Sequence, residues 1–387
     1  MIIGFDAKRI VRNATGLGNY ARSLVNDLAA LGDDHLQLRL YAPDAGRDQL
    51  RRQVSTASGV CLCYPPAANT AARLLPAGLY KAWWRSAGVV RQLQADGVQL
   101  YHGLSGELPL GLRDSGVRGI VTIHDLIFMR HPEYYHPWDR WMYEWKFRQT
   151  LRQAHRIIAI SECTRRDVAT LGGISPDRID LIYQTCHPRY AEALPPDRLR
   201  ATAGRLQLPQ CFLLSVGSIE ERKNLLLAVS ALPLLPERLH LVAVGKATPY
   251  AKKVAEAARR MGVAERLHML HGVSDTDLQA LYQLAQVFVY PSRYEGFGIP
   301  VIEAIQSGLP VVACTGSCLE EAGGPDSLYV APDDAPALAA AIGRMLPGAP
   351  ERMGRIERSR RYVRRFEGGS VAAQVAAIYR EELHNRG

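Results

Sequence analysis

The chain has 387 residues, of which 47% are hydrophobic and 22% charged, the composition of a globular protein with room for two or three domains. No apolar run approaches the roughly 20 residues that a membrane-spanning helix requires, which excludes an integral membrane protein. Lys and Arg number 47 against 38 Asp and Glu, and the net charge of +9 favours anionic partners such as nucleotides, phosphates, nucleic acid or an acidic membrane surface.

The chain opens at residues 1–6 as a predicted strand, without the basic and long apolar segments of a secretory signal, so we expect a cytoplasmic location. Its seven cysteines are scattered and no His cluster accompanies them. This usage favours reduced thiols, and we expect neither a disulfide framework nor a zinc site.

Short, almost continuously apolar runs alternate with helical segments along the whole chain. Such runs are typical of parallel strands covered by helices on both faces, so we predict an α/β fold of two doubly wound, Rossmann-like domains. The predicted strands are 1–6, 36–42, 98–102, 119–124, 156–160 and 179–183, then 211–217, 239–245, 267–273, 286–291, 310–314 and 327–331.

A proline-rich segment interrupts this alternation near the middle of the chain and predicts a domain boundary. We predict an N-terminal domain at 1–187, a linker at 188–210 and a second domain at 211–366, which ends in an Arg-rich helix from 351. We also predict a last helix at 367–387, which can cross back to the N-terminal domain. Ligands of such sheets bind beyond the carboxyl ends of strands, so we expect the functional residues there, facing a cleft between the domains.

Two motifs of the first half follow predicted strands. Gly16-Leu-Gly18 opens a helix, where backbone N–H groups favour an anion, although a bland tight turn explains the glycines equally well. His124-Asp125 ends the strand at 119–124 and is expected to point into the cleft. The alternative for His124 is a ring that is satisfied by a loop carbonyl.

The loop after the strand at 211–217 is the most informative of the second half. Gly217 and Ser218 are followed by two adjacent cations, Arg222 and Lys223, just before a predicted helix at Asn224. Positive side chains and a helix N-terminus would converge on one spot, which suits a diphosphate. The alternative is a solvated charged turn.

A second loop follows the strand at 286–291 and contains Glu295-Gly296-Phe297-Gly298. Its glycines let the backbone approach a ligand closely. Glu303 lies eight residues after Glu295 on the helix that follows, and a carboxylate there can accept two hydrogen bonds from a vicinal diol such as a ribose. The alternative is an unrelated pair of acids, one in the loop and one on the helix.

Three other polar positions are predicted to have structural roles. Ser161 is expected to cap a helix, and Ser274 or Asp275 to cap another, in preference to a metal site at Asp275 and Asp277. We therefore expect no metal. In the loop at 316–324, no role is expected for Cys318.

Taken together, these motifs resemble the retaining glycosyltransferases of family 4, which have the two-domain GT-B fold. The strongest match is Glu295-Gly-Phe-Gly-Ile-Pro-Val-Ile-Glu303, the E-x7-E motif of that family, and the motifs at 216–224, 16–20 and 124–125 fall in the expected order. The segments 4–20 and 124–135 are similar to bacterial mannosyltransferases of surface polysaccharide synthesis. The resemblance implies transfer of a sugar, with mannose from GDP-mannose as the best choice, to a saccharide or lipid-linked saccharide, without a cofactor.

The resemblance also implies roles for the donor-binding residues. Arg222 and Lys223 would hold the donor diphosphate beside Gly217 and Ser218, the last standing where many members have Arg. Glu303 would hold the ribose hydroxyls.

For the reacting groups, Glu295 would contact the donor sugar near its transferring carbon, with backbone N–H groups of Phe297 and Gly298 and the adjacent Gly296. His124 would reach the donor sugar or its phosphate. Gly16, Gly18 and Asp125 would lie on the acceptor side.

Two other functions stay open: a sugar-nucleotide 2-epimerase on the same architecture, and a non-catalytic protein that binds nucleic acid or membrane through its basic balance. No nucleic-acid motif accompanies the Arg-rich helix. Trp83 and Trp84, flanked by Lys81 and Arg85, predict an amphipathic helix that rests on the inner face of an anionic membrane. The alternative is an ordinary helix packed on the first sheet.

Overall fold

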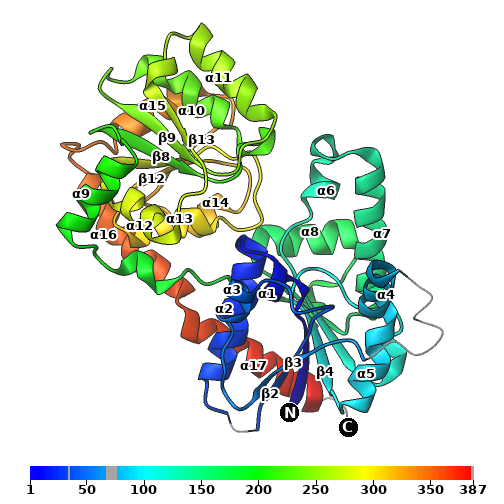
Figure 1. Cartoon of the computed structure of the whole chain (residues 1–387). Helices are drawn as coiled ribbons and strands as arrows, with labels where there is room; N and C mark the ends of the chain where they lie inside the picture. Colours follow the sequence, from blue (N-terminus) through cyan, green and yellow to red (C-terminus); the bar gives the residue numbers. More distant parts are fainter. Residues whose placement is uncertain (34, 67–75, 385–387) are drawn as a thin grey trace. The chain divides into compact units, whose positions relative to one another are not determined.

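The computed structural model describes residues 1–33, 35–66 and 76–384 and divides into two compact units (Figure 1). The first unit combines residues 1–185 with the C-terminal segment from 368 onward, and the second consists of residues 186–367. Both are doubly wound α/β units, as predicted from the apolar runs.

The first unit is built on a sheet of parallel strands in the order β3-β2-β1-β4-β5-β6-β7, in which the order of the first six is that of dinucleotide-binding folds. The register pairs Phe5 with Leu40 on one side and with His102 on the other. The strands span Ile2–Asp6 (β1), Gln37–Tyr41 (β2), Val60–Cys63 (β3), Leu100–Gly103 (β4), Arg118–Ile123 (β5), Arg156–Ala159 (β6) and Ile179–Leu181 (β7).

Helices bury both faces of this sheet, which explains why its strands have no polar face. One apolar cluster joins the sheet to α1, α2 and α17, and another joins it to α5, α7 and α8. The helices are Lys8–Arg12 (α1), Gly16–Ala30 (α2), Asp48–Arg51 (α3), Ala77–Trp83 (α4), Val89–Ala95 (α5), Ile127–Arg130 (α6), Pro137–Gln153 (α7), Glu162–Gly172 (α8) and Gly368–His384 (α17), with a π-helical stretch at Trp84–Gly88.

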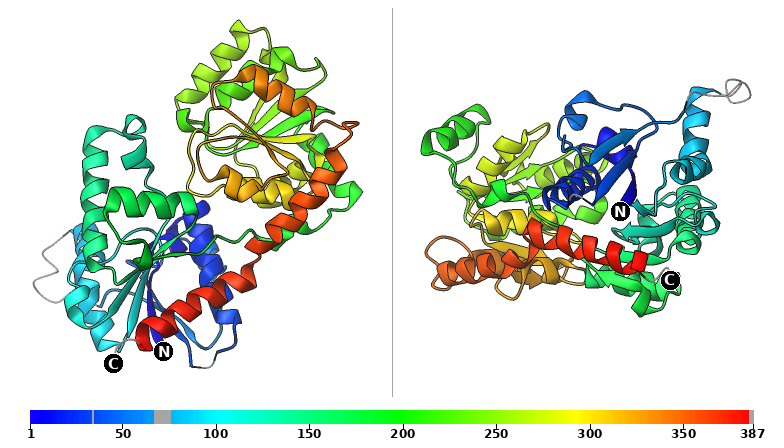
Figure 2. Two further views of the ribbon diagram at one scale, coloured as in Figure 1. Left: turned by 180° about the vertical axis from the view of Figure 1, so that it is seen from behind. Right: turned by 90° about the horizontal axis from the view of Figure 1, so that it is seen from below.

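The C-terminal helix α17 belongs to the first unit and lies alongside α2 (Figure 2). Tyr379 is fully buried on this helix, and its hydroxyl contacts Nδ1 of His102 on β4 at 2.6 Å. Two ion pairs hold the helix further, from Glu382 to Arg118 and from Arg380 to Asp33. The last helix therefore packs on the N-terminal domain, the first unit.

The second unit repeats the design with a sheet in the order β10-β9-β8-β11-β12-β13. Its strands span Phe212–Val216 (β8), His240–Val244 (β9), Leu267–Leu270 (β10), Val287–Tyr290 (β11), Val311–Cys314 (β12) and Leu328–Val330 (β13). Its helices are Pro196–Arg205 (α9), Leu225–Ala231 (α10), Tyr250–Arg260 (α11), Asp275–Leu284 (α12), Ile299–Gln306 (α13), Leu319–Gly323 (α14), Ala335–Gly343 (α15) and Arg352–Val363 (α16).

The segment 188–210, expected to be a linker, is instead an integral part of the second unit. It contains α9, which packs on α12, and Gln279 of α12 donates hydrogen bonds to the carbonyls of Arg189 and Glu192. Its prolines begin helices rather than mark a loose connection, because proline is well tolerated in the first turn of a helix.

The two tryptophans of the predicted membrane helix, Trp83 and Trp84, differ in their exposure. Trp84 is only 2% exposed, and its indole N–H donates to Gln92, whereas Trp83 is 51% exposed. The prediction of a Trp83-Trp84 membrane surface is therefore wrong for Trp84, which packs in the core under α5. Within the described ranges, no helix has the length and apolar character needed to cross a bilayer.

Candidate functional site

In the second unit, the loop after β8 is shaped by close backbone approach. Gly217 has φ of +148°, a conformation that favours glycine, and the Lys223 side chain lies against it. A Cβ on Gly245, at the end of β9, would come within 1.8 Å of the Gly217 carbonyl oxygen. Gly245 is thus a second required glycine, which the motifs of the sequence did not single out.

The two cations of this loop meet Glu295 from the loop after β11. The Lys223 Nζ lies 2.6 Å from Glu295 Oε1 and donates to the Tyr290 hydroxyl at 2.7 Å, while Arg222 lies 3.0 Å from Glu295 Oε2. Arg222 also donates to the Tyr294 carbonyl at 2.5 Å. The sequence predicted that these loops share a site, and the structure shows their side chains in direct ion pairs.

The electrostatics of this cluster follow from its burial, since Glu295 is 8% exposed. Burial alone would raise the pKa of the Glu295 carboxyl, but Lys223 and Arg222 outweigh it and hold that pKa at about 2. Glu295 in turn raises the pKa of Lys223 despite desolvation. At neutral pH the cluster is fully ionised, and with Glu220, which pairs with Arg222, its charges balance.

The loop of Glu295 is fixed by two features. The Cys318 thiol donates to the carbonyl of Glu295 at 3.2 Å and to that of Phe297 at 2.9 Å, so the expectation that Cys318 has no role is wrong. Gly298 has φ of +108° and precedes α13, and a Cβ there would lie 2.9 Å from Leu319. The Phe297 side chain is buried against Phe366, so at this position only the backbone can face a ligand.

Glu303 occupies the second turn of α13 and is separate from the Lys223 cluster in its contacts. The Tyr282 hydroxyl donates to Glu303 Oε2 at 2.8 Å. Loss of hydration raises the pKa of the Glu303 carboxyl to about 7, with the tyrosine hydrogen bond acting in the opposite sense. A carboxyl in this state is half ionised at neutral pH.

A small pocket opens beside the cluster and is lined by Gly217, Ser218, Lys223, Tyr290 and Ser292, among other residues. The structure thus brings together five of the predicted positions, since Glu295 forms ion pairs with both Lys223 and Arg222. Tyr290 also belongs to this cluster, because its hydroxyl accepts a hydrogen bond from Lys223, and no sequence motif points to it. The pocket has a volume of about 10 Å³, so a phosphate would bind at its mouth, where it would meet an ammonium and a glycine backbone.

In the first unit, His124 follows β5 and has both ring nitrogens occupied. Its Nε2 contacts the Leu104 carbonyl at 2.8 Å, and Gln184 lies 2.7 Å from its Nδ1. Burial lowers the pKa of His124 to about 4, so the ring is neutral at pH 7. The alternative of a histidine satisfied by a loop carbonyl describes this ring, and the structure shows no nitrogen left for another partner.

A pocket of about 290 Å³ is lined by two of the predicted positions of the first unit, His124 and Asp125. Leu17 of the Gly16–Gly18 turn lines it together with His124 and Asp125. Gly18 is required there, because a Cβ would lie 1.8 Å from the Asn13 carbonyl oxygen, whereas Gly16 has open space around it. The remaining walls mix charged and aromatic side chains: Arg9, Glu107, Lys146, Phe128, Tyr135, Tyr143 and Phe147.

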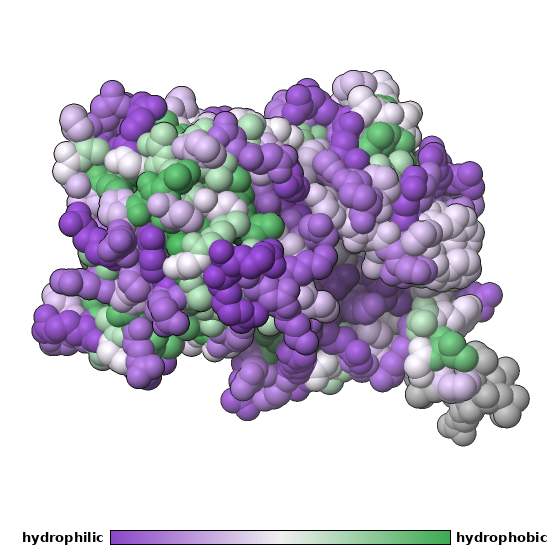
Figure 3. All heavy atoms as spheres, turned by 90° about the horizontal axis from the view of Figure 1, so that it is seen from above, coloured by the Kyte–Doolittle hydropathy of each residue, from purple (hydrophilic) through white to green (hydrophobic). Residues whose placement is uncertain are grey.

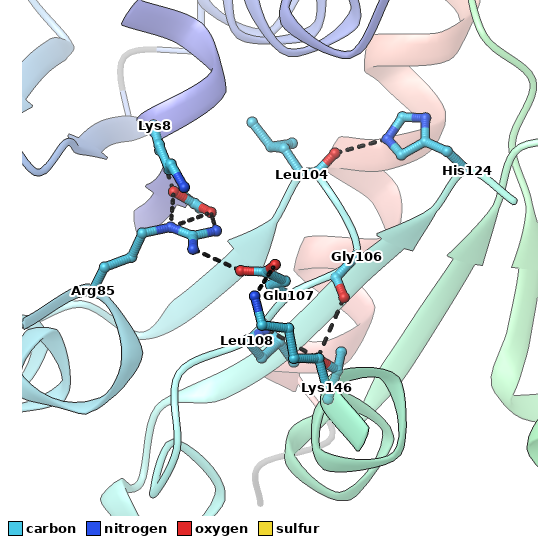
Figure 4. A network of polar contacts seen from close by, with 10 residues as sticks. Lys8, Arg85, Leu104, Gly106, Glu107, Leu108, His124 and Lys146 are labelled. Carbon is cyan, nitrogen blue, oxygen red and sulfur yellow. Dashed lines mark hydrogen bonds and ion pairs between the residues drawn. The ribbon is translucent and has the colours of Figure 1, made fainter. Parts of the chain in front are cut away.

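Glu107 and Lys146 of this lining belong to a charged network (Figure 4). Asp6 at the end of β1 accepts from Arg85 at 2.7 Å, Arg85 bonds to Glu107 at 2.6 Å, and Glu107 contacts Lys146 of α7 at 3.3 Å. Arg85 more than offsets the effect of burial on Asp6, so the pKa of that carboxyl is lowered. Arg85 and Lys146 likewise outweigh burial at Glu107, so the pKa of that carboxyl is lowered as well.

The residues expected to cap helices do so. The Ser161 hydroxyl accepts from the Thr164 N–H at the start of α8, and the Ser274 hydroxyl accepts from the Asp277 N–H at the start of α12. Asp277 also pairs with Arg205. Its carboxylate is thus engaged in the fold, and no group of three or more possible metal ligands occurs in the part of the chain that the structure describes.

Comparisons with known proteins agree with this architecture. The family model "Glycosyltransferase Family 4" matches residues 14–187, and "Glycosyl transferases group 1" matches residues 203–362. The O-antigen chain mannosyltransferase B of Escherichia coli is 31% identical over 356 residues, 88% of this chain and 90% of that protein. Anabaena HepE in complex with UDP and glucose has a TM-score of 0.74 at 17% identity, over 98% of this chain and 99% of its own. WaaG, a glycosyltransferase involved in lipopolysaccharide biosynthesis, has a TM-score of 0.70 at 19% identity, over 98% and 99%.

Proposed function

Because the chain belongs to the family 4 glycosyltransferases with the GT-B fold, we propose that it transfers mannose from GDP-mannose to a hydroxyl of a saccharide or lipid-linked saccharide. The product would be part of a cell-surface polysaccharide. The observation that carries the choice of sugar is the relative that matches over 90% of its length, an O-antigen chain mannosyltransferase.

The donor diphosphate would bind at the loop after β8, where Lys223 faces Gly217 and Ser218 in the pocket. The diphosphate adds negative charge to a cluster whose charges already balance. Its binding would use the one N–H that Lys223 has left beyond its bonds to Glu295 and Tyr290. Backbone N–H groups of the loop would add to this, as they do wherever glycines let a phosphate approach. Glu303 would accept the ribose hydroxyls.

In the reaction, the bond between the anomeric carbon and the diphosphate oxygen breaks, and an acceptor hydroxyl attacks the same face, which retains the configuration. The proton of this hydroxyl would pass to the departing diphosphate oxygen. Charge develops on the leaving phosphate, so catalysis is electrostatic and positional. This route needs no enzyme nucleophile, and we nominate none. Glu295, ionised and held by two cations, would lie near the transferring carbon and favour its developing positive charge.

The acceptor would occupy the pocket of the first unit. Aromatic walls at Tyr135 and Tyr143 offer flat apolar surfaces to a sugar ring, and Glu107 and Asp125 offer acceptors to its hydroxyls. His124 is neutral and held in one orientation, so its role toward the donor would be to shape the pocket rather than to transfer a proton.

A thermal-shift screen against GDP-, UDP-, dTDP- and ADP-sugars tests the donor. A true donor at 100 times its Kd adds roughly 2.7 kcal/mol to the free energy of unfolding, and we expect this for GDP-mannose. Product analysis by NMR then tests the reaction. An α-mannoside formed only in the presence of an acceptor alcohol supports the proposal, whereas an epimerised nucleotide sugar without an acceptor would show the 2-epimerase.

A further inference from the structure

Helix α7 carries aromatic side chains on the face that points away from the sheet. Trp138 is 65% exposed and Trp141 is 58% exposed, and their rings stack at 5.1 Å. Trp145 follows one turn later and is also exposed. Isolated exposed apolar residues are ordinary on a protein surface. Three tryptophans on one helix, two of them in contact, form an exposed aromatic patch, and such patches are typical of interaction surfaces.

The sequence of α7 places this patch in a regular stripe. Residues 138, 141, 145, 148 and 152 follow each other at intervals of three and four, which brings them to one face of the helix. The last two are Arg148 and Arg152, both exposed. We call the five residues Trp138, Trp141, Trp145, Arg148 and Arg152 the α7 stripe. The opposite face holds Phe147, Thr150 and Leu151, which are buried on the sheet.

Tryptophan and arginine together are the side chains of a water–membrane interface. The indole ring is large and amphipathic and prefers the headgroup region to both water and hydrocarbon, and arginine attracts anionic lipid. Four cations and two acids lie on α7, within a chain of net charge +9. Seen from above, the surface of the protein is mostly hydrophilic, and hydrophobic residues form separate patches on it (Figure 3).

The position of the α7 stripe relative to the pocket of the first unit explains how binding to a membrane would serve the reaction. The other side of the same helix supplies Tyr143, Lys146 and Phe147 to the 290 Å³ pocket. A lipid surface against the stripe would therefore lie one helix away from the pocket in which, on the function proposed above, the acceptor saccharide binds. A lipid-linked saccharide needs this arrangement, because its sugar cannot travel far from the bilayer that holds its lipid.

We propose that the α7 stripe rests on the headgroup layer of an anionic bilayer and presents the pocket to acceptors anchored there. The surface differs from the Trp83-Trp84 helix predicted from the sequence, because Trp84 is in the core. Since Trp138 and Trp141 are exposed and line no pocket of the candidate site, their replacement should leave the fold and the pocket unchanged.

Co-sedimentation with vesicles of phosphatidylcholine and phosphatidylglycerol in equal parts tests the proposal on the full chain. The variant Trp138→Ala/Trp141→Ala should bind these vesicles about tenfold more weakly than the wild type, and the wild type should bind pure phosphatidylcholine vesicles more weakly still. Trp83→Ala is the matched control, because Trp83 is a tryptophan of similar exposure on α4, and it should stay within about twofold of the wild type. Unchanged melting temperatures establish that the variants are folded.

Three results would overturn the docking surface: no binding of the wild type to anionic vesicles, equal binding of the wild type and the double variant, or a loss with Trp83→Ala as large as with the double variant. Transfer to a water-soluble acceptor separates this from the proposed function. The double variant should keep wild-type turnover in solution and lose it only with acceptors embedded in vesicles. Absence of turnover in the wild type would refute the proposed function and leave the vesicle result to stand by itself.

Discussion

Replacement of Lys223 by methionine removes the ammonium group from the buried cluster and keeps most of the side-chain volume. In the wild type the two cations hold the pKa of Glu295 at about 2 against an ordinary value of 4.5. That difference corresponds to about 3 kcal/mol of stability at neutral pH. Lys223→Met leaves Arg222 as the remaining partner of a buried carboxylate, so we expect the free energy of unfolding of the second unit to fall by about 2–3 kcal/mol.

The dependence on pH follows from the sign of the shift. A carboxyl whose pKa is lowered on folding stabilises the protein above its unfolded pKa, and this stability is lost as the pH falls toward the folded value. The difference between the wild type and Lys223→Met should therefore be full above about pH 4.5 and should shrink as the pH falls toward 2.

Urea unfolding followed by circular dichroism measures the difference in stability between the wild type and Lys223→Met. Tryptophan fluorescence serves as an internal reference. All five tryptophans lie in the first unit, so their fluorescence reports that unit and should keep its midpoint in the variant. The double variant Lys223→Met/Glu295→Gln is the matched control. It should be more stable than Lys223→Met, because no buried carboxylate is left with one partner. A loss below about 1 kcal/mol at pH 7, or one that grows toward low pH, would refute this reasoning.

Three further expectations concern the same site and its support, and a fourth concerns the packing of α17 in the first unit. Binding of the donor nucleotide, measured by calorimetry, should weaken about tenfold from pH 8 to pH 6 as Glu303 takes up a proton, and Glu303→Gln should flatten that profile. Cys318→Ala should lower stability by about 1–2 kcal/mol and raise the donor KM, with Cys318→Ser restoring most of both. Gly245→Ala should displace the loop at Gly217 and abolish donor binding in a folded protein; wild-type affinity would contradict the backbone contact. Tyr379→Phe should cost about 1–2 kcal/mol in urea unfolding of the first unit, because it leaves the buried Nδ1 of His102 without its partner while Nε2 keeps Thr122; no change would argue against the bond to Tyr379.

Most of the architecture could be predicted from the sequence because parallel strands buried on both faces leave a strong signal. All twelve predicted strands are present, and the missed one is β3, a four-residue edge strand that is only partly buried. Its four residues, Val60-Cys61-Leu62-Cys63, are apolar, but the run is too short and too exposed to stand out from the surrounding chain. The linker was mistaken for a loose segment because its prolines read as breakers, whereas they begin helices in the structure.

The candidate site was predicted residue by residue but not in its pairings. Arg222, Lys223 and Glu295 were each selected, yet no spacing in the sequence indicates that a carboxylate 72 residues away occupies both cations. The role of Cys318 could not be predicted, because a lone cysteine forms no sequence motif. Only the fold brings its thiol to the carbonyls of Glu295 and Phe297. Trp84 shows the same limit, since adjacent residues on a helix face different sides.

The most direct test of the account is a crystal structure with the donor nucleotide bound. We predict that the diphosphate lies within hydrogen-bond distance of Lys223 and the Gly217–Ser218 backbone, and that the ribose hydroxyls donate to Glu303. A nucleotide held instead in the pocket beside His124, with Lys223 and Arg222 still engaged only by Glu295, would contradict it.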